Sequence, residues 1–310
     1  MWQQYVYNGL AGSRPYFVYT PAQYQVGTAV PLLVMLHGCT QTPGDFAIGT
    51  QMNQLADQYN FIVVYPQQTS TYSSYSCWNW YDQTHQCRGS GEPAIIASIV
   101  QDVTEKTTQW TIDPRRIYVA GISAGAAMAV ILGATYPDIF AAIGVHAGLE
   151  YGAVTNQAHS TRVSRRSGPD PIGQGQAAYG AMGGFARVVP TIVFHGTSDH
   201  VVNIVNGDQV VQQWMQTNIL AANGTYVADF HKPNTTQIEQ LTGGRSSTVY
   251  TWNDVYGNEV QTYWKVNSLG HAWSGGSYKG SYTDAKGPNA SQAIYAFFMR
   301  HPLPEPAKPE

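Results

Sequence analysis

Residues 117–128 read Ile117-Tyr118-Val119-Ala120-Gly121-Ile122-Ser123-Ala124-Gly125-Ala126-Ala127-Met128, an apolar strand that leads into a run of small residues. The pattern Gly-x-Ser-x-Gly falls at the junction. A serine held on a sharp strand-to-helix turn needs small neighbours, because strand and helix approach closely there. Gly121 and Gly125 supply this room. The context therefore favours a nucleophile elbow, with Ser123 as the nucleophile, over an ordinary tight turn.

On both sides of this segment, apolar runs alternate with helical stretches. This alternation predicts an α/β protein with a mostly parallel central sheet and helices on both faces. We expect buried strands at 31–37, 61–65, 117–120, 142–145 and 190–194, helices at 43–59, 92–110, 124–136, 204–220 and 288–300, and antiparallel pairs formed by 4–8 with 14–20 and within 248–266.

The predicted elements form one catalytic domain over residues 1–301. Residues 148–186 interrupt the alternation with a segment rich in Gly, Ser, Gln and Ala, which we interpret as an inserted loop or lid; a solvent-exposed excursion without a role is the alternative. Residues 302–310 contain four prolines and are expected to form a disordered tail.

The composition excludes several functional classes. Charged residues make up 11% of the 310 residues and the net charge is −3, so a basic nucleic-acid-binding surface is not expected. Apolar stretches are too short to cross a bilayer. The N-terminus shows no signal peptide, but the polar, weakly charged composition favours a mature secreted protein; a cytoplasmic location is the alternative. Nothing in the sequence predicts the oligomeric state.

A serine nucleophile requires a base and an acid that orients the base, and on this type of fold they follow in the order Ser, Asp or Glu, His. Asp199 follows the predicted strand at 190–194, and His271 follows the strand that ends at 266. Both side chains should therefore lie at the strand ends beside Ser123. Weaker alternatives for these roles are His195, which lies at the end of the strand, His200, which directly follows Asp199, and Asp208, which lies within a predicted helix.

The oxygen of a tetrahedral intermediate needs two hydrogen-bond donors. We expect the backbone N–H groups of Ala124 and Cys39 to form this oxyanion hole, since Gly38 allows the loop after the 31–37 strand to turn toward the site. Cys39 as a competing nucleophile is the minor alternative. The histidines show no metal-ligand spacing, so we expect neither a metal nor a cofactor.

Two further cysteines, Cys77 and Cys87, lie in one aromatic loop. A disulfide between them would close a small loop and stabilise the fold by ~2–3 kcal/mol. We expect this bond; two unrelated thiols are the alternative.

Four motifs together resemble the polyhydroxybutyrate depolymerase family of esterases, which has the α/β-hydrolase fold and is related to feruloyl and acetylxylan esterases. The motifs are Leu36-His37-Gly38-Cys39-Thr40-Gln41, Cys77-Trp78-Asn79-Trp80 with Arg88-Gly89-Ser90-Gly91-Glu92-Pro93, Gly121-Ile122-Ser123-Ala124-Gly125, and Gly270-His271-Ala272-Trp273-Ser274-Gly275-Gly276.

The resemblance implies a cofactor-independent serine esterase that acts on short-chain hydroxyalkanoate or polyester-type esters. Cleavage of feruloyl or acetyl esters on plant cell-wall polysaccharides is the alternative. It also implies a triad of Ser123, Asp199 and His271, oxyanion donors at Cys39 and Ala124, and a Cys77–Cys87 disulfide. Substrate contacts are expected from Trp78, Trp80 and Trp273, whose rings suit an acyl group, a sugar or a polyester chain; ordinary loop packing is the alternative.

Overall fold

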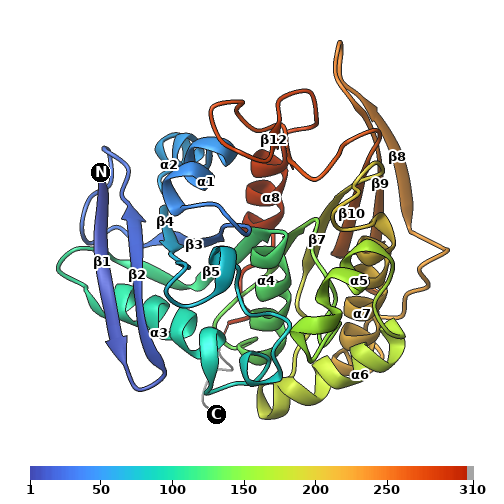
Figure 1. Cartoon of the computed structure of the whole chain (residues 1–310), viewed down its shortest axis with the longest axis horizontal. Coiled ribbons are helices and arrows are strands. Elements are labelled where there is room, and N and C mark those ends of the chain that lie inside the picture. Colours follow the sequence, from blue (N-terminus) through green and yellow to red (C-terminus); the bar gives the residue numbers. More distant parts are fainter. Residues whose placement is uncertain (306–310) are drawn as a thin grey trace.

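The computed structural model describes residues 1–305 and is built around one ten-stranded sheet (Figure 1). The strand order is β1-β2-β4-β3-β5-β6-β7-β10-β9-β8. Neighbouring strands from β4 to β10 run parallel, as predicted. These central strands are β3 (Val30–Leu36), β4 (Ile62–Pro66), β5 (Ile112–Ile122), β6 (Ile143–His146), β7 (Thr191–Gly196) and β10 (Glu259–Val266).

Antiparallel strands complete the sheet at both edges. The expected hairpins are confirmed: β1 (Trp2–Gly9) pairs with β2 (Gly12–Tyr19), and β9 (Ser246–Asn253) pairs with β10. The outermost strand, β8 (Thr235–Gln240), was not expected. Its sequence, TTQIEQ, lacks the alternation of apolar and polar residues that marks a half-buried strand, and all six of its residues are exposed.

Helices cover both faces of the sheet and enclose two apolar cores. Along β3, Leu32 and Val34 belong to one core and Leu33 and Met35 to the other, because successive side chains of a strand point to opposite faces. The first core also contains side chains of α3 (Gly91–Glu105), α4 (Ala124–Thr135) and α7 (Ile204–Ala221), and the second those of α1 (Pro43–Thr50), α2 (Met52–Tyr59) and α8 (Ala290–Met299).

The helix expected over residues 43–59 is two helices. Gln51 has φ 58° and ψ 22°, the left-handed conformation, and its N–H bonds to the carbonyl of Ala47 to end α1. The same residue is the N-cap of α2, which begins at Met52. The prediction was wrong here because the left-handed residue at the break is a glutamine, rather than the glycine that such a position usually takes.

The 148–186 segment is more ordered than the loop we expected. It contains α5 (Ser160–Arg165) and α6 (Pro171–Met182), with short 3-10 turns at Gln157–His159 and Gly183–Phe185. Asp170 caps α6 by accepting hydrogen bonds from the N–H groups of Ile172 and Gly173. Ala178 and Met182 are buried in the first core, so α6 forms part of the packed domain.

The beginning of the expected disordered tail is fixed to the sheet. The N–H of Leu303 donates to the carbonyl of Arg115, and the Arg115 guanidinium donates to the Leu303 carbonyl, each at 2.8 Å. This corrects the expectation for residues 302–305, and the remainder of the tail, 306–310, lies outside the described residues. Within residues 1–305, no helix combines the length and apolarity needed to cross a bilayer.

One buried carboxyl group in the 148–186 segment lacks a partner. Glu150 is 4% exposed, and neither of its side-chain oxygens has a hydrogen-bond partner among the described residues. Burial, with a smaller contribution from the charge of Asp170, raises the pKa of Glu150 to about 8. In the unfolded chain this carboxyl ionises at its ordinary pKa of 4.5. The folded state therefore binds the proton more tightly, and the stability from this group is lost as the pH rises from about 4.5 to about 8.

The substitution Glu150→Gln should remove this pH dependence, because the amide is neutral throughout. We expect the variant to unfold at nearly the wild-type temperature at pH 4.5, and to exceed it by several degrees at pH 9. Thermal unfolding followed by circular dichroism at both pH values measures the difference. An equal difference in unfolding temperature between variant and wild type at the two pH values would contradict the raised pKa of Glu150.

Candidate active site

Ser123 lies at the sharp turn between β5 and α4, as predicted. Its backbone has φ 56° and ψ −122°, a region that residues with a side chain rarely adopt. The Ser123 N–H donates to the His146 carbonyl at 3.0 Å, which fixes the turn to β6. A methyl group at Gly125 would collide with the backbone of Leu36 and His37, so only glycine fits beside the end of β3.

Asp199 and His271 meet at the same end of the sheet. They follow β7 and β10, which are adjacent parallel strands, so their loops emerge side by side. His271 Nδ1 lies 2.7 Å from Asp199 Oδ2, and Asp199 Oδ1 accepts the N–H groups of Val201 and Val202 at 2.9 Å. Burial alone would raise the pKa of Asp199, but the hydrogen bond and charge of His271 outweigh it and hold that pKa below its ordinary value. The carboxylate is thus kept ionised, and it favours a proton on His271 Nδ1.

Ser123 and His271 line one cavity of about 160 Å³, together with Gly38, Thr40 and Tyr282. With the proton on Nδ1, the Nε2 atom of His271 is left as an acceptor for the serine proton. No hydrogen bond links the two side chains within residues 1–305; such bonds are often long until substrate is present. The structure thus brings the three residues of the predicted triad to one place, and their catalytic roles stay predictions.

The two amides predicted for the oxyanion hole lie beside Ser123 and are free to donate. Ala124 is the first residue of α4, and Cys39 lies in the loop after β3. Neither N–H donates a hydrogen bond to another described residue. The two cavities beside Ser123 include Cys39 in their linings, and one of them includes Ala124. A carbonyl oxygen bound at Ser123 could therefore receive both hydrogen bonds.

The Cys39 loop is held by side chains to which the sequence analysis assigned no role. The Gly38 N–H donates to Gln41 Oε1 at 2.9 Å, and Gln41 Nε2 donates to Asp45 Oδ2 at 3.1 Å. His37 is buried and contacts the Gly38 carbonyl through Nδ1 at 2.8 Å, while its Nε2 accepts the N–H of Gln68 at 3.1 Å. Burial lowers the pKa of His37 to about 4, so its ring is neutral and one nitrogen can donate while the other accepts.

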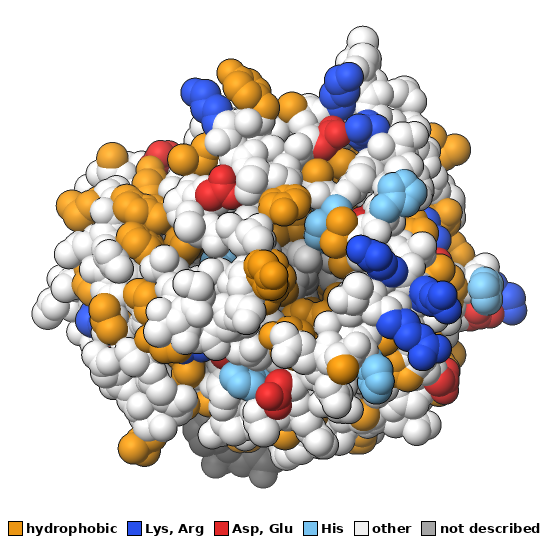
Figure 2. All heavy atoms as spheres, in the orientation of Figure 1, with side chains coloured by type: hydrophobic (Ala, Val, Ile, Leu, Met, Phe, Trp, Pro, Cys, Tyr) orange, Lys and Arg blue, Asp and Glu red, His pale blue; other side chains and the backbone are white. Residues whose placement is uncertain are grey.

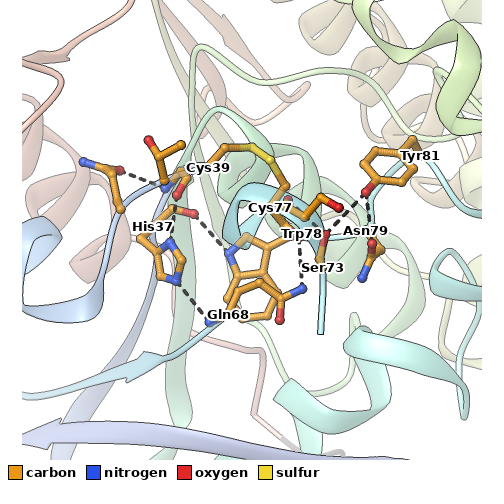
Figure 3. The surroundings of a disulfide bond; sticks show 12 residues. His37, Cys39, Gln68, Ser73, Cys77, Trp78, Asn79 and Tyr81 are labelled. Carbon is orange, nitrogen blue, oxygen red and sulfur yellow. Dashed lines mark hydrogen bonds between the residues drawn. A yellow bond between two sulfur atoms is a disulfide. The ribbon is translucent and has the colours of Figure 1, made fainter. Parts of the chain in front are cut away.

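The disulfide joins Cys39 to Cys77, which corrects the expected Cys77–Cys87 bond. Figure 3 shows the bond linking the loop after β3 to the aromatic loop, beside His37, Gln68 and Trp78. Cys87 is a free, exposed thiol beyond the 3-10 turn Gln83–His85. Proximity in the sequence did not predict the pairing, because the folded loop places Cys77 beside Cys39 rather than beside Cys87.

The aromatic loop is anchored by a buried carboxylate. Glu92 accepts hydrogen bonds from Arg14 Nη2 at 3.0 Å, from the Asn79 N–H at 2.7 Å and from Asn79 Nδ2 at 2.8 Å; Gln68 Nε2 is a further donor. Because Glu92 is fully buried, these hydrogen bonds replace the solvent that would otherwise stabilise its carboxylate. The long loop therefore has a defined shape although it contains little regular structure.

Two of the three tryptophans expected to bind substrate, Trp78 and Trp273, are buried in the protein interior. Trp78 is fully buried and donates its indole N–H to the His37 carbonyl at 3.0 Å. Trp273 is 1% exposed, donates to Ser291 Oγ at 3.0 Å and stacks on His146 with ring centroids 5.0 Å apart. Neither lines a cavity at Ser123, so ordinary packing, the alternative reading, describes them better.

Trp80 does reach the site. It lines a second cavity of about 230 Å³ that shares Ser123 and Cys39 with the first. The lining of this cavity also includes Tyr81, Leu149 and residues of α5. The space-filling view shows the resulting hollow near the centre of one face (Figure 2). Ser123 thus lies where two cavities meet, which allows the two parts of an ester to extend in different directions.

The variant Cys77→Ser should lose about 3–4 kcal/mol of stability, because the Cys39–Cys77 bond closes a loop with a sequence separation of 38. Chemical denaturation measures the loss. The control Cys87→Ser, which removes the free thiol, should leave the free energy of unfolding within about 0.5 kcal/mol of wild type. A large loss in the Cys87 variant, or a Cys77–Cys87 peptide found by mass spectrometry, would contradict this pairing.

Proteins similar in sequence to this chain include enzymes named as a polyester depolymerase and as acetylxylan esterases. Over 186 residues the chain is 38% identical to a poly(3-hydroxyalkanoate) depolymerase C of Paucimonas lemoignei, a match that covers 59% of this chain and 44% of the relative. It is 30% identical over 253 residues to a probable acetylxylan esterase A of Neosartorya fischeri, covering 77% and 64% of the two chains. The chain thus spans about half to two thirds of the length of these relatives.

The overall structure has a similar solved counterpart. An acetyl xylan esterase from Aspergillus awamori superposes with a TM-score of 0.74 at 22% identity, over 97% of this chain and 99% of the other, which shows a shared α/β-hydrolase fold. The family model described as esterase PHB depolymerase matches residues 15–232, a segment that contains Cys39, Ser123 and Asp199. The chain therefore belongs to the esterase PHB depolymerase family.

Proposed function

We propose that this protein is a serine carboxylic-ester hydrolase that works through an acyl-enzyme on Ser123. The observation that carries the proposal is the 2.7 Å hydrogen bond between Asp199 and His271, located beside a serine on a strained turn. This combination orients an imidazole and presents a hydroxyl to it, as nucleophilic catalysis requires. The membership in an esterase family supports the reaction class.

The reaction follows from these groups. His271 Nε2 takes the proton of the Ser123 hydroxyl as Oγ attacks the ester carbonyl, and the resulting oxyanion accepts hydrogen bonds from the Cys39 and Ala124 amides. The tetrahedral intermediate collapses, His271 gives the proton to the leaving alkoxide, and the alcohol departs. Water then attacks the acyl-enzyme carbonyl while His271 takes its proton. The second tetrahedral intermediate collapses by breaking the bond to Ser123 Oγ, His271 returns the proton to Oγ, and the carboxylic acid departs. Protein groups and water carry every proton in this cycle.

We propose short-chain hydroxyalkanoate or polyester-type esters as the substrates. The relative with 38% identity carries the name poly(3-hydroxyalkanoate) depolymerase C, which supports this choice. Feruloyl or acetyl esters of plant polysaccharides are the second candidate. This candidate is favoured by matches at about 30% identity to acetylxylan and feruloyl esterases, including a feruloyl esterase B of Neurospora crassa at 28% identity. The Cys39–Cys77 disulfide supports a secreted location, because such bonds persist in oxidising compartments.

The substitution Ser123→Ala should reduce kcat for p-nitrophenyl butyrate by at least about 10⁴-fold, because the covalent step needs the hydroxyl. Steady-state kinetics measure the loss, and thermal unfolding verifies that the variant folds. The control Ser70→Ala, at an exposed position, should retain wild-type kcat. Substantial activity in the Ser123 variant would refute the proposed nucleophile.

A substrate panel separates the two candidate classes. We expect kcat/KM to be highest for 3-hydroxybutyrate oligomers, and lower for methyl ferulate and acetylated xylan. The assay measures released acid for every substrate under the same conditions. A clear preference for methyl ferulate or acetylated xylan would instead establish the cell-wall esterase.

A further inference from the structure

Three arginines on helix α5 or directly after it have no partner within residues 1–305. Arg162, Arg165 and Arg166 are exposed and form neither an ion pair nor a side-chain hydrogen bond there. Every other arginine of the chain donates to a carboxylate or a carbonyl: Arg14, Arg88, Arg115, Arg116, Arg187, Arg245 and Arg300. Three unpaired positive charges thus lie on and directly after one short helix, in a protein whose net charge is −3.

These arginines border the active-site cavities. Arg165 lines the 230 Å³ cavity with Ser123, and among residues 1–305 it is the one charged side chain in that lining. Arg162 lines a neighbouring cavity of about 550 Å³, whose described lining contains no acidic residue. Figure 2 shows Lys and Arg side chains gathered on one side of the central hollow, over the region where Figure 1 places α5.

The acidic residues of the neighbouring segment are already engaged or buried. Asp170 uses both carboxylate oxygens to cap α6. Glu150 is buried, and its pKa of about 8 keeps it mostly neutral at pH 7. Neither carboxylate pairs with Arg165, so among the described residues the guanidinium of Arg165 is available to a ligand. Guanidinium groups bind carboxylates through paired N–H donors, which gives both affinity and orientation.

We propose that Arg165, assisted by Arg162 and Arg166, binds a free carboxylate on the substrate, so that the enzyme prefers anionic esters over neutral ones. This inference rests on the proposed function and narrows its substrate class to hydroxyalkanoate oligomers with a free acid end. The rest of the cavity suits such a chain, because Trp80, Tyr81 and Leu149 offer apolar and aromatic surface for its methyl-bearing backbone. A uronic acid on a plant polysaccharide presents the same group, and the test separates the two sources.

The test compares each anionic ester with a neutral counterpart. The first pair is the 3-hydroxybutyrate trimer as free acid and as its methyl ester, measured at pH 7.5 in low salt. Wild type should show a higher kcat/KM for the acid, mainly through a lower KM. In Arg165→Gln the ratio of the two kcat/KM values should fall at least about tenfold, since a hydrogen-bonded charge pair is lost. Arg165→Lys should restore part of the ratio, because the charge remains without the paired donors.

Lys286→Gln is the matched control, because it removes one exposed positive charge outside these cavity linings. This variant should keep the wild-type ratio. A wild type that hydrolyses acid and methyl ester equally, or an Arg165→Gln variant with an unchanged ratio, would overturn the inference. Failure of every ester, including p-nitrophenyl butyrate, would instead count against the proposed function.

The second pair is acetylated glucuronoxylan and acetylated xylan without uronic acid. We expect both to be poor substrates with similar kcat/KM. A strong preference for the glucuronoxylan that Arg165→Gln abolishes would overturn the oligomer assignment and identify the uronic acid as the source of the carboxylate.

Discussion

The close approach of strand and helix at Ser123 is the constraint on which the rest of the site depends. Ser123 has a strained backbone, and Gly125 lies so near the end of β3 that a side chain there would strike the Leu36 and His37 carbonyls. This contact places the serine directly beside the loop that carries Cys39. The same close packing that exposes the proposed nucleophile, Ser123, therefore also places the Cys39 amide beside it. A larger residue at Gly125 would separate the two.

The topology of the sheet places the other groups of the site, Asp199 and His271, near Ser123. Because β3, β5, β7 and β10 are parallel, the loops after their carboxyl ends gather at one edge, where ligands bind in open α/β sheets. Each loop is then held by specific contacts. The disulfide and Gln41 hold the Cys39 loop, the Val201 and Val202 amides hold Asp199, and Asp199 holds His271. This pre-organisation is what an active site needs, since precise placement lowers the reorganisation required during reaction.

The sequence predicted those parts of the fold and site that depend on local pattern. The turn at Ser123 has a strict requirement for small residues, and Asp199 and His271 follow recognisable buried strands, so chain order identified them. Pairings across distant loops could not be predicted in this way. Cys77 bonds with Cys39 rather than with Cys87, its nearer neighbour, because the anchoring of the aromatic loop on Glu92 decides where Cys77 lies. Trp78 and Trp273 carry the same side chain as Trp80. All three rings are buried, and only the folded structure shows that Trp80 alone among them lines the cavity at Ser123. Arg165 lies in a segment that we expected to be an inserted loop or lid, and its significance depends on its having no partner in the part of the chain that the structure describes, which no sequence pattern predicts.

A crystal structure of the protein after reaction with a diethyl phosphonate inhibitor tests the central claim most directly. The account predicts phosphorus bonded to Ser123 Oγ, with the phosphoryl oxygen within about 2.7–3.1 Å of both the Cys39 and Ala124 nitrogens. It also predicts that His271 Nε2 faces the modified serine while Nδ1 keeps its contact with Asp199. Phosphorus on another residue, or a phosphoryl oxygen turned away from both amides, would contradict it.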